Sequence, residues 1–372
     1  MNKKLVVAVL GLGLVGVTGL ASADLTLYGQ LDLSLNFKNS DFKNANPLTG
    51  RPADPILALG DNINGVGDDI NMGSNQSAVG FKGSEDLGNG LSAFFKVEYQ
   101  TDIAGNGANT WQGRDQYIGL ASDSYGKLTF GSMSTAYKSP GSKIDPFYRT
   151  SLQSRVWGLQ SALHRGKGEN GQGRTVNTLR YDSPSFYNVK LFGTYNFDQN
   201  KYDANDDDTY SIGAQYSGGN LFVAASYIDT QASGPKDTAA AQLIARYDWN
   251  AISFHGIYEL DKGLITAARS QGLNSAGTVG GANDDGADLW SLGATYTIGN
   301  NLIGFDYGQG SDSKGSDGAG NAADNLQEYD SWRIAAYHKF SARTRLYAGY
   351  VNQDFKDSGE QDLFSLGMRH NF

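Results

Sequence analysis

The sequence predicts an all-β chain, a sixteen-stranded antiparallel barrel that spans a membrane, and three observations predict it. Apolar and polar residues alternate with period two through most of the 372 residues, as in strands that have one apolar and one polar face. The alternating runs are mostly about ten residues long, close to the ~9–11 residues that a barrel strand needs to cross a bilayer. The composition, with 49 Gly, 21 Tyr, 17 Phe and only 7 Pro, suits many strands joined by tight turns.

The first 23 residues are predicted to be a secretory signal peptide. Lys3 and Lys4 give a basic start, an apolar run covers residues 5–20, and Ala21-Ser22-Ala23 has the small-residue form of a cleavage site. An uncleaved anchor is the alternative, because the apolar run is slightly long. Cleavage removes two lysines, so the net charge falls from −9 to −11, and residues 24–372 are predicted to form a single barrel domain.

Period-two alternation defines sixteen strands in this reading, and short turns alternate with longer polar loops along the second half of the chain. Short turns on one side and long loops on the other are typical of bacterial outer-membrane barrels. An even count also places the last strand beside the first, which closes the sheet and removes its edges. A soluble exported β-sandwich is the alternative architecture. The predicted strands are residues 25–37, 76–83, 91–101, 114–122, 127–132, 175–182, 189–197, 209–216, 221–229, 238–249, 252–260, 288–298, 302–310, 328–340, 345–355 and 362–372.

The two faces of the first and third strands illustrate the pattern. In the first strand Leu31 belongs to the apolar face, whereas Gln30 and Asp32 belong to the polar face, and the polar face of a barrel strand points into the lumen. In the third strand Lys96 and Glu98 share the polar face, so we expect both of these side chains to line the lumen.

The stretch Met133–Arg174 breaks the alternation for about forty residues, and an insert of that length in a compact domain is usually either functional or a sign of a wrong assignment. Its charge is opposite in sign to that of the whole chain, since it contains seven cations and two carboxylates, a net charge of +5. We therefore expect this third loop to fold into the lumen and narrow it. Salt bridges from the loop to wall carboxylates such as Glu98 and Asp32 are an alternative role, and both can hold. The charged residues of the loop are Lys138, Lys143, Asp145, Arg149, Arg155, Arg165, Lys167, Glu169 and Arg174.

Catalytic, metal and nucleic-acid roles find little support in the composition. The chain has no Cys and four His, which are scattered and form no H-x-x-x-H pair. No Ser, His and carboxylate set stands out for a hydrolase, and the acidic balance argues against nucleic acid. The acidic runs at residues 203–208 and 284–285 are possible Ca²⁺ ligands without EF-hand spacing, and solvated loop surface is the alternative. We expect no enzyme, no cofactor and no metal site.

Three passages resemble the general porins of Gram-negative outer membranes: Leu25–Asp32 (LTLYGQLD), Gly80–Leu91 (GFKGSEDLGNGL) and the closing Gly367–Phe372 (GMRHNF). The resemblance implies a sixteen-stranded, water-filled barrel, usually trimeric, that passes small hydrophilic solutes. Arg114 and Arg174 match the family's wall arginines by position. The sequence has Gln30, Ala78 and Ser132 where the family usually has basic residues, and its loop is basic rather than acidic, so the constriction is expected to be positive on both sides.

The sequence and the resemblance together predict an outer-membrane porin, a passive diffusion channel for ions and small hydrophilic solutes that leans weakly toward anions. A dedicated oxyanion channel of the phosphate type is the first alternative, and a barrel that serves as surface adhesin or structural anchor is the second. Expected partners are outer-membrane lipid and lipopolysaccharide, and two further copies in a homotrimer. Phe372 is the expected assembly signal. The expected constriction and lumen residues are Lys96, Glu98, Arg114, Asp145, Arg149, Arg155, Arg174 and Arg180.

Overall fold

The computed structural model describes residues 24–42, 69–105, 111–165, 167–168, 173–197, 208–230, 239–265, 286–312, 328–356 and 359–372. The predicted signal peptide, residues 1–23, lies outside these described residues. The same is true of the acidic positions 203–207 and 284–285, so the calcium hypothesis for these loops stays a prediction.

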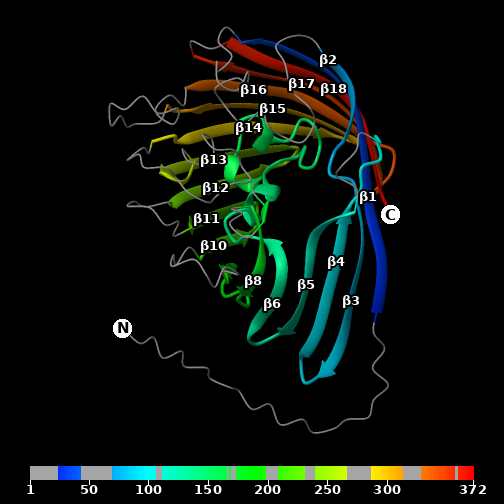
Figure 1. The fold of residues 1–372 in the computed structure, drawn as a ribbon, viewed down its shortest axis with the longest axis vertical. Coiled ribbons are helices and arrows are strands. Elements are labelled where there is room, and N and C mark those ends of the chain that lie inside the picture. The colour runs from blue at the N-terminus through cyan, green and yellow to red at the C-terminus, as the bar shows by residue number, and fades with distance from the viewer. Residues whose placement is uncertain are drawn as a thin grey trace, which may run out of the picture.

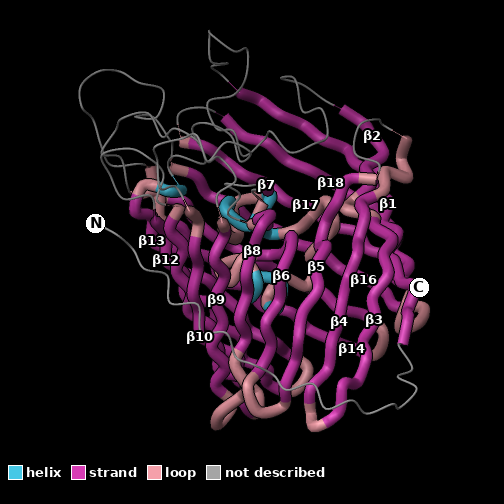
Figure 2. The backbone as a smooth tube through the Cα atoms, turned by 60° about the horizontal axis from the view of Figure 1, so that its bottom comes forward, coloured by secondary structure: helices cyan, strands magenta, loops and turns pink. Residues whose placement is uncertain are grey.

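The described residues form one closed antiparallel wall of strands, which Figures 1 and 2 show from two directions. From β3 to β18 the strands of the wall pair in chain order, with β6 next to β8, and β1 pairs with β18 from Gln30 opposite Asn371 to Phe42 opposite Gly359. The strands are β1 (Asp24–Phe42), β2 (Asp69–Ser74), β3 (Ala78–Gly88), β4 (Leu91–Gln100), β5 (Gln112–Ser122), β6 (Gly126–Ser134), β7 (Lys167–Gly168), β8 (Arg174–Asp182), β9 (Val189–Asn196), β10 (Tyr210–Gly218), β11 (Leu221–Asp229), β12 (Ala239–Trp249), β13 (Ile252–Lys262), β14 (Leu289–Ile298), β15 (Asn301–Gly310), β16 (Tyr329–Lys339), β17 (Thr344–Phe355) and β18 (Gly359–Asn371).

The wall contains sixteen strands, as predicted, because β2 and β3 occupy one place in it. β2 pairs with Leu33–Lys38 of β1, and β3 pairs with Asp24–Gln30 of the same strand, so the two are halves of one strand broken at residues 75–77. The two-residue β7 adds only a short parallel pairing to β8. The closed sixteen-stranded barrel is therefore confirmed. No helix in the part of the chain that the structure describes is long and apolar enough to cross a membrane.

The two faces of the wall differ in polarity as the alternation predicts. Along β1, Asp32, Ser34 and Asn36 are buried on the inner face, whereas Leu35 and Phe37 are exposed on the outer face. Aromatic side chains gather near both ends of the outer face, with Trp290 against Tyr307 and Trp332 against Tyr350 at one end and exposed Tyr247, Trp249 and Tyr296 near the short turns. Two aromatic girdles around an apolar band are the membrane-facing signature of a barrel.

Two local predictions were wrong, because residues 84–90 and residues 38–75, which lie between predicted strands, both contain strand residues. The predicted turn Ser84–Gly90 is mostly strand, because β3 runs to Gly88 and pairs Ser84 with Phe94 and Asp86 with Ser92. Only Asn89 and Gly90 make the turn, both with positive φ (53° and 72°), which is the backbone shape that a two-residue hairpin needs. β2 lies in a segment that was expected to be a polar loop, and its Ile70 and Met72 are exposed on the outer face.

The segment between β6 and β8 carries three short 3-10 turns, η2 (Ser139–Lys143), η3 (Ser154–Val156) and η4 (Ala162–His164). These turns, green in Figure 1, lie inside the curve of the strands. Phe147, Leu152 and Trp157 pack with inner-face side chains such as Tyr347 and Val351 of β17. The segment and the inner wall therefore share a hydrophobic cluster.

Candidate functional site

Charged side chains from β4, β5, β8 and the β6–β8 segment meet on the inner face of the wall. Glu98 of β4 organises one part of this group. Its Oε1 accepts a hydrogen bond from Arg114 Nε at 2.7 Å and another from Arg149 at 2.9 Å, and its Oε2 lies 3.3 Å from Lys96 Nζ. Because Arg149 belongs to the β6–β8 segment, Glu98 ties that segment to the wall.

Asp115 organises the second part, and it was not among the predicted site residues. Its carboxylate accepts from Lys96 Nζ at 2.8 Å and from Arg174 at 3.0 Å. The pairing of β4 with β5 shifts between Val97 and Tyr99, so Glu98 faces two consecutive residues of β5, Arg114 and Asp115. Such a bulge re-aims a side chain, which is how two neighbours both reach the inner face. The sequence carries no signal for this bulge.

Arg155 and Lys138 complete the group without a carboxylate of their own. Arg155 donates to Gln153 Oε1 at 2.9 Å, to the His164 carbonyl at 3.1 Å and to Gln76 Oε1 at 2.8 Å, all neutral oxygens. Its guanidinium also covers the Tyr148 ring at 4.9 Å. Burial, reinforced by the charges of Arg155 and Arg174, holds the pKa of Lys138 well below its usual range. We call these eight residues the charge cluster: Lys96, Glu98, Arg114, Asp115, Lys138, Arg149, Arg155 and Arg174.

Gln76 reaches Arg155 from the break between β2 and β3. Its backbone has a positive φ of 55°, a conformation that costs free energy for a residue with a side chain. Its amide accepts from Arg155 and donates to Gln153 Oε1 at 3.2 Å. The interruption of the wall strand therefore supplies a side chain that holds the segment near η3.

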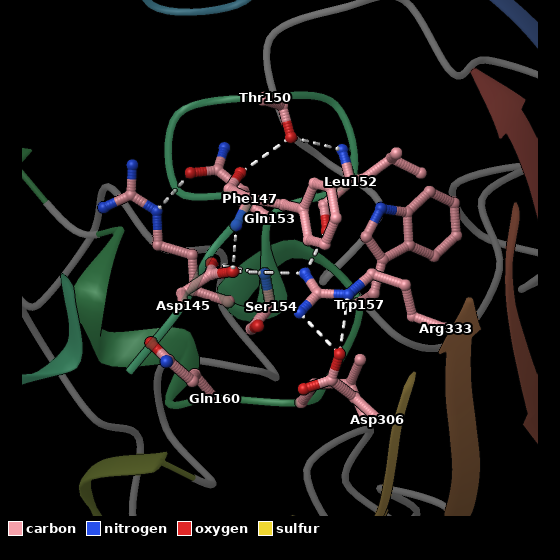
Figure 3. A network of polar contacts seen from close by, with 12 residues as sticks. Asp145, Phe147, Thr150, Leu152, Gln153, Ser154, Trp157, Gln160, Asp306 and Arg333 are labelled. Atoms are coloured by element: carbon pink, nitrogen blue, oxygen red, sulfur yellow. Dashed lines mark hydrogen bonds and ion pairs between the residues drawn. The ribbon is translucent and has the colours of Figure 1, made fainter. Parts of the chain in front are cut away.

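A separate ion network fixes the segment to the opposite wall, and Figure 3 shows it. Arg333 of β16, fully buried, donates to Asp306 at 2.7 Å and 3.0 Å and to Asp145 at 3.2 Å. Asp145 also accepts from the backbone N–H groups of Phe147 and Ser154. Asp145 was predicted as a lumen residue, but its carboxylate is committed to this anchor rather than to the arginines of the charge cluster.

Arg180 and Phe372 lie apart from the charge cluster. Arg180 forms hydrogen bonds to both carboxylate oxygens of Asp182 and to Ser139 Oγ of the segment at 2.8 Å. Phe372 exchanges two backbone hydrogen bonds of 3.1 Å with Gly29 of β1, and its ring occupies the space where a Cβ on Gly29 would lie. The last residue thus completes the seam that closes the barrel.

The structure brings together six of the predicted site residues: Lys96, Glu98, Arg114, Arg149, Arg155 and Arg174. It adds Asp115 and Lys138 to them, and it places Asp145 and Arg180 in other networks. That the predicted site residues line a pore stays a prediction. Among the described residues, no group of three or more His, Cys, Asp or Glu is arranged to hold a metal ion.

A closed barrel with an apolar, aromatic-banded exterior and a polar, charged interior is a membrane-spanning barrel with an interior built for polar solutes. The sequence model of the Gram-negative porin family matches residues 7–358, and the chain belongs to this family. It is an outer-membrane β-barrel.

Curated relatives match over nearly the whole chain. The major outer membrane protein P.IB of Neisseria sicca is 25% identical over 384 residues, covering 95% of this chain and 96% of that protein. An outer membrane porin protein of Bordetella pertussis is 26% identical over the full length of both chains. Among solved structures, an anion-selective porin from Comamonas acidovorans has a TM-score of 0.67 at 20% identity, covering 94% of this chain and all of that one. An OmpF structure from Salmonella typhi has a TM-score of 0.63 at 17% identity, covering 94% and 97%.

Proposed function

We propose that this porin is a passive diffusion channel for ions and small hydrophilic solutes, narrowed at the charge cluster and weakly selective for anions. One observation supports the selectivity most directly: apart from Lys138, whose pKa is lowered, the charge cluster holds five cationic side chains and two carboxylates, an excess of three positive charges. Rings of fixed charge at a narrow point select ions electrostatically.

The size of the expected effect follows from Coulomb's law. An ion that passes ~6 Å from one fixed charge has a Coulomb interaction energy with it of roughly 0.7 kcal/mol in bulk-like water. Salt screens this interaction over a Debye length of ~8 Å at physiological ionic strength. Glu98 and Asp115 each offset part of the cationic charge nearby. Selectivity of a few-fold, without loss of flow, is therefore the expected outcome.

The reversal potential of single channels in a KCl gradient tests this proposal. Wild-type channels should favour chloride modestly, and the combined change of Arg149, Arg155 and Arg174 to Gln should move the potential toward cation preference while the conductance stays measurable. The matched control changes three exposed cations that lie outside the charge cluster and off the inner face, Lys262, Arg343 and Lys356, to Gln. A strongly cation-selective wild type, or equal shifts from both triple variants, contradicts the proposed placement of the selectivity.

A dedicated oxyanion channel, the first alternative, predicts a phosphate current that saturates at low concentration and little chloride current. An adhesin or anchor with a plugged lumen predicts almost no current in either salt. The same bilayer recordings therefore separate all three candidate functions.

We further propose that the chain assembles as a homotrimer surrounded by lipid and lipopolysaccharide of the outer membrane. The support is membership of the porin family and the continuous apolar outer face. Chemical cross-linking in detergent, followed by denaturing gels, should give a ladder that ends at three copies. A ladder that ends at one copy contradicts the trimer.

A further inference from the structure

Phe94 is an aromatic residue on the otherwise polar inner face of β4. Its neighbours on that face are Ser92, Lys96 and Glu98. The tip of the Phe94 ring lies over Gly119 of β5, where a Cβ would come within 2.5 Å of the ring atom Cζ. Covering Gly119 accounts for part of the ring surface, but the side chain is only half-buried. The remainder of the ring therefore faces the interior of the barrel.

Two tyrosines extend this aromatic surface across the inner wall. The Tyr117 ring of β5 meets the Phe94 ring edge-on, with centroids 6.2 Å apart and planes at 77°. Tyr28 of β1 is held by a hydrogen bond of 3.0 Å from its hydroxyl to Glu98 Oε2. Both tyrosines are half-buried. Because aromatic rings attract one another in edge-to-face and offset-stacked arrangements, the angle between Phe94 and Tyr117 can receive a third flat ring.

Two lysines with exposed side chains flank these rings. Lys82 Nζ lies 5.5 Å from the centroid of the Tyr28 ring, and Lys127 Nζ lies 5.9 Å from the centroid of the Phe94 ring. Neither lysine forms an ion pair with any residue that the structure describes. Asp182, which lies opposite Lys127 in the strand ladder, is already paired with two other cations. Both ammonium groups are therefore available to a carboxylate that approaches the rings.

These five residues, Tyr28, Lys82, Phe94, Tyr117 and Lys127, are called the aromatic strip below. They come from β1, β3, β4, β5 and β6, of which β3 to β6 lie side by side in Figure 2. The strip begins beside Glu98 and extends toward the short turns at Asn89–Gly90 and residues 123–125. It therefore lies between the charge cluster and the short-turn end of the barrel.

We propose that the aromatic strip binds solutes that combine a flat aromatic ring with a carboxylate. The ring packs in the angle between Phe94 and Tyr117, and the carboxylate lies near Lys82 or Lys127. A small anion without a ring gains nothing from the aromatic side chains, so the strip discriminates by the ring and not by charge alone. This inference rests on the proposed diffusion channel, and it adds a preferred solute class at a position outside the charge cluster.

Benzoate is the probe, because it is ionised at neutral pH and carries one flat ring. Single-channel chloride current should fall saturably as benzoate is added at constant ionic strength. Acetate has the same charge and no ring, so it should give no saturable block at the same concentrations. Equal block of the wild-type channel by benzoate and acetate overturns the aromatic strip.

Phe94→Leu should raise the half-blocking concentration of benzoate about fivefold, the ratio that corresponds to the ~1 kcal/mol of an aromatic pair. The matched control is Phe95→Leu, because Phe95 lies over Gly83 in the same way but on the outer face, and its block should equal that of the wild type. Phe94→Tyr keeps the ring and should also behave as the wild type. Equal half-blocking concentrations in Phe94→Leu and Phe95→Leu contradict the proposal.

The two lysines test the carboxylate part of the proposal. Lys82→Gln and Lys127→Gln should each raise the half-blocking concentration of benzoate about threefold, a modest effect because the charges are exposed and screened by salt. Lys262→Gln, at an exposed position on the outer face, should leave it unchanged. If all three variants block as the wild type does, the strip does not select for an anionic ring.

A measurement on the wild-type protein covers the case in which a variant fails to fold. Azidobenzoate, a photoreactive analogue, should attach on illumination to β4 and β5 around Phe94 and Tyr117, as read by mass spectrometry. Excess benzoate should suppress this labelling, and excess acetate should not. Labelling elsewhere, or equal suppression by both acids, overturns the strip. A channel that conducts KCl but shows no preference for benzoate over acetate defeats the strip alone, whereas a barrel without KCl current defeats the proposed function.

Discussion

Glu98 carries much of the electrostatic balance of the charge cluster at the scale of single residues. It is 2% exposed and contacts three cations, Lys96, Arg114 and Arg149. Removing one partner from a buried ionic group leaves the other charges uncompensated, which typically costs ~3–5 kcal/mol. The stability of the segment and the sign of the selectivity therefore depend on the same carboxylate.

Glu98→Gln should lower the temperature at which the folded barrel converts to the unfolded band on gels, and it should shift the reversal potential further toward anions. The control is Glu328→Gln, because Glu328 pairs with Lys356 at an exposed position where ion pairs contribute ~0–1 kcal/mol. An unchanged potential in Glu98→Gln means that ions do not pass near this carboxylate.

His164 makes the β6–β8 segment sensitive to acid. Its ring bonds Gln242 of β12 at 3.0 Å, and burial beside Arg155 and Lys138 lowers its pKa to about 3, against ~6.5 for a solvated His. The released segment binds a proton at His164 below pH ~6.5 and the docked segment does not, so docking weakens as the pH falls from 6.5 toward 3.

Conductance fluctuations should accordingly become more frequent in this acid range. His164→Gln keeps a hydrogen-bonding group toward Gln242 and removes the titration, so the increase should be smaller. If the variant fluctuates with the same pH profile as the wild type, other groups control the docking.

At the scale of strands, the alternation predicted the wall well because one face meets lipid and the other meets polar groups. Leu31 and Gln30 test that reading directly. Leu31 shares its face with exposed Leu35 and Phe37, whereas Gln30 shares its face with buried Asp32. An Arg on the lipid face near the bilayer midplane costs ~2–4 kcal/mol, while a lumen change mainly tunes selectivity.

Leu31→Arg should therefore impair assembly into detergent-stable barrels, and Gln30→Arg should not. Folding yield on unheated gels measures both. Equal impairment, or the reverse order, means that the two faces are exchanged, since a slip of one residue inverts a whole strand.

The strand pattern could not predict departures from regular strand pairing. Asp115 reaches the inner face only because of the bulge opposite Glu98, and Gln76 reaches Arg155 only because the wall strand breaks with a positive φ. Neither residue type nor spacing distinguishes these positions from ordinary strand. The turn at Asn89–Gly90 was misplaced for a related reason, because polar residues at a strand end resemble a loop.

At the scale of the whole molecule, the sequence predicted the closed barrel but not how the segment crosses it. Even spacing and a final strand with alternating apolar residues suffice to predict closure. The anchor between Arg333 and Asp145 joins residues 188 positions apart, and no local pattern indicates that pairing. The excess positive charge of the segment was predictable from the sequence, but which of its cations pair with carboxylates of the wall was not.

The anchor predicts that the segment can be released without unfolding the wall. Arg333→Met leaves Asp145 and Asp306 as buried carboxylates without their shared cation, and breaking such a network typically costs ~3–5 kcal/mol. The ladder of hydrogen bonds around the barrel involves none of these side chains, so strand content by circular dichroism should stay unchanged.

The released segment should then be cut by trypsin at its Lys and Arg residues, and single-channel conductance should rise and fluctuate. Arg343→Met, at the exposed turn between β16 and β17, is the matched control and should behave as the wild type. Equal resistance to trypsin in both variants means that Glu98 and the core around Phe147 and Leu152 hold the segment on their own. Loss of strand structure in Arg333→Met means instead that wall and segment fold as one unit, because the barrel then needs the filled interior to close.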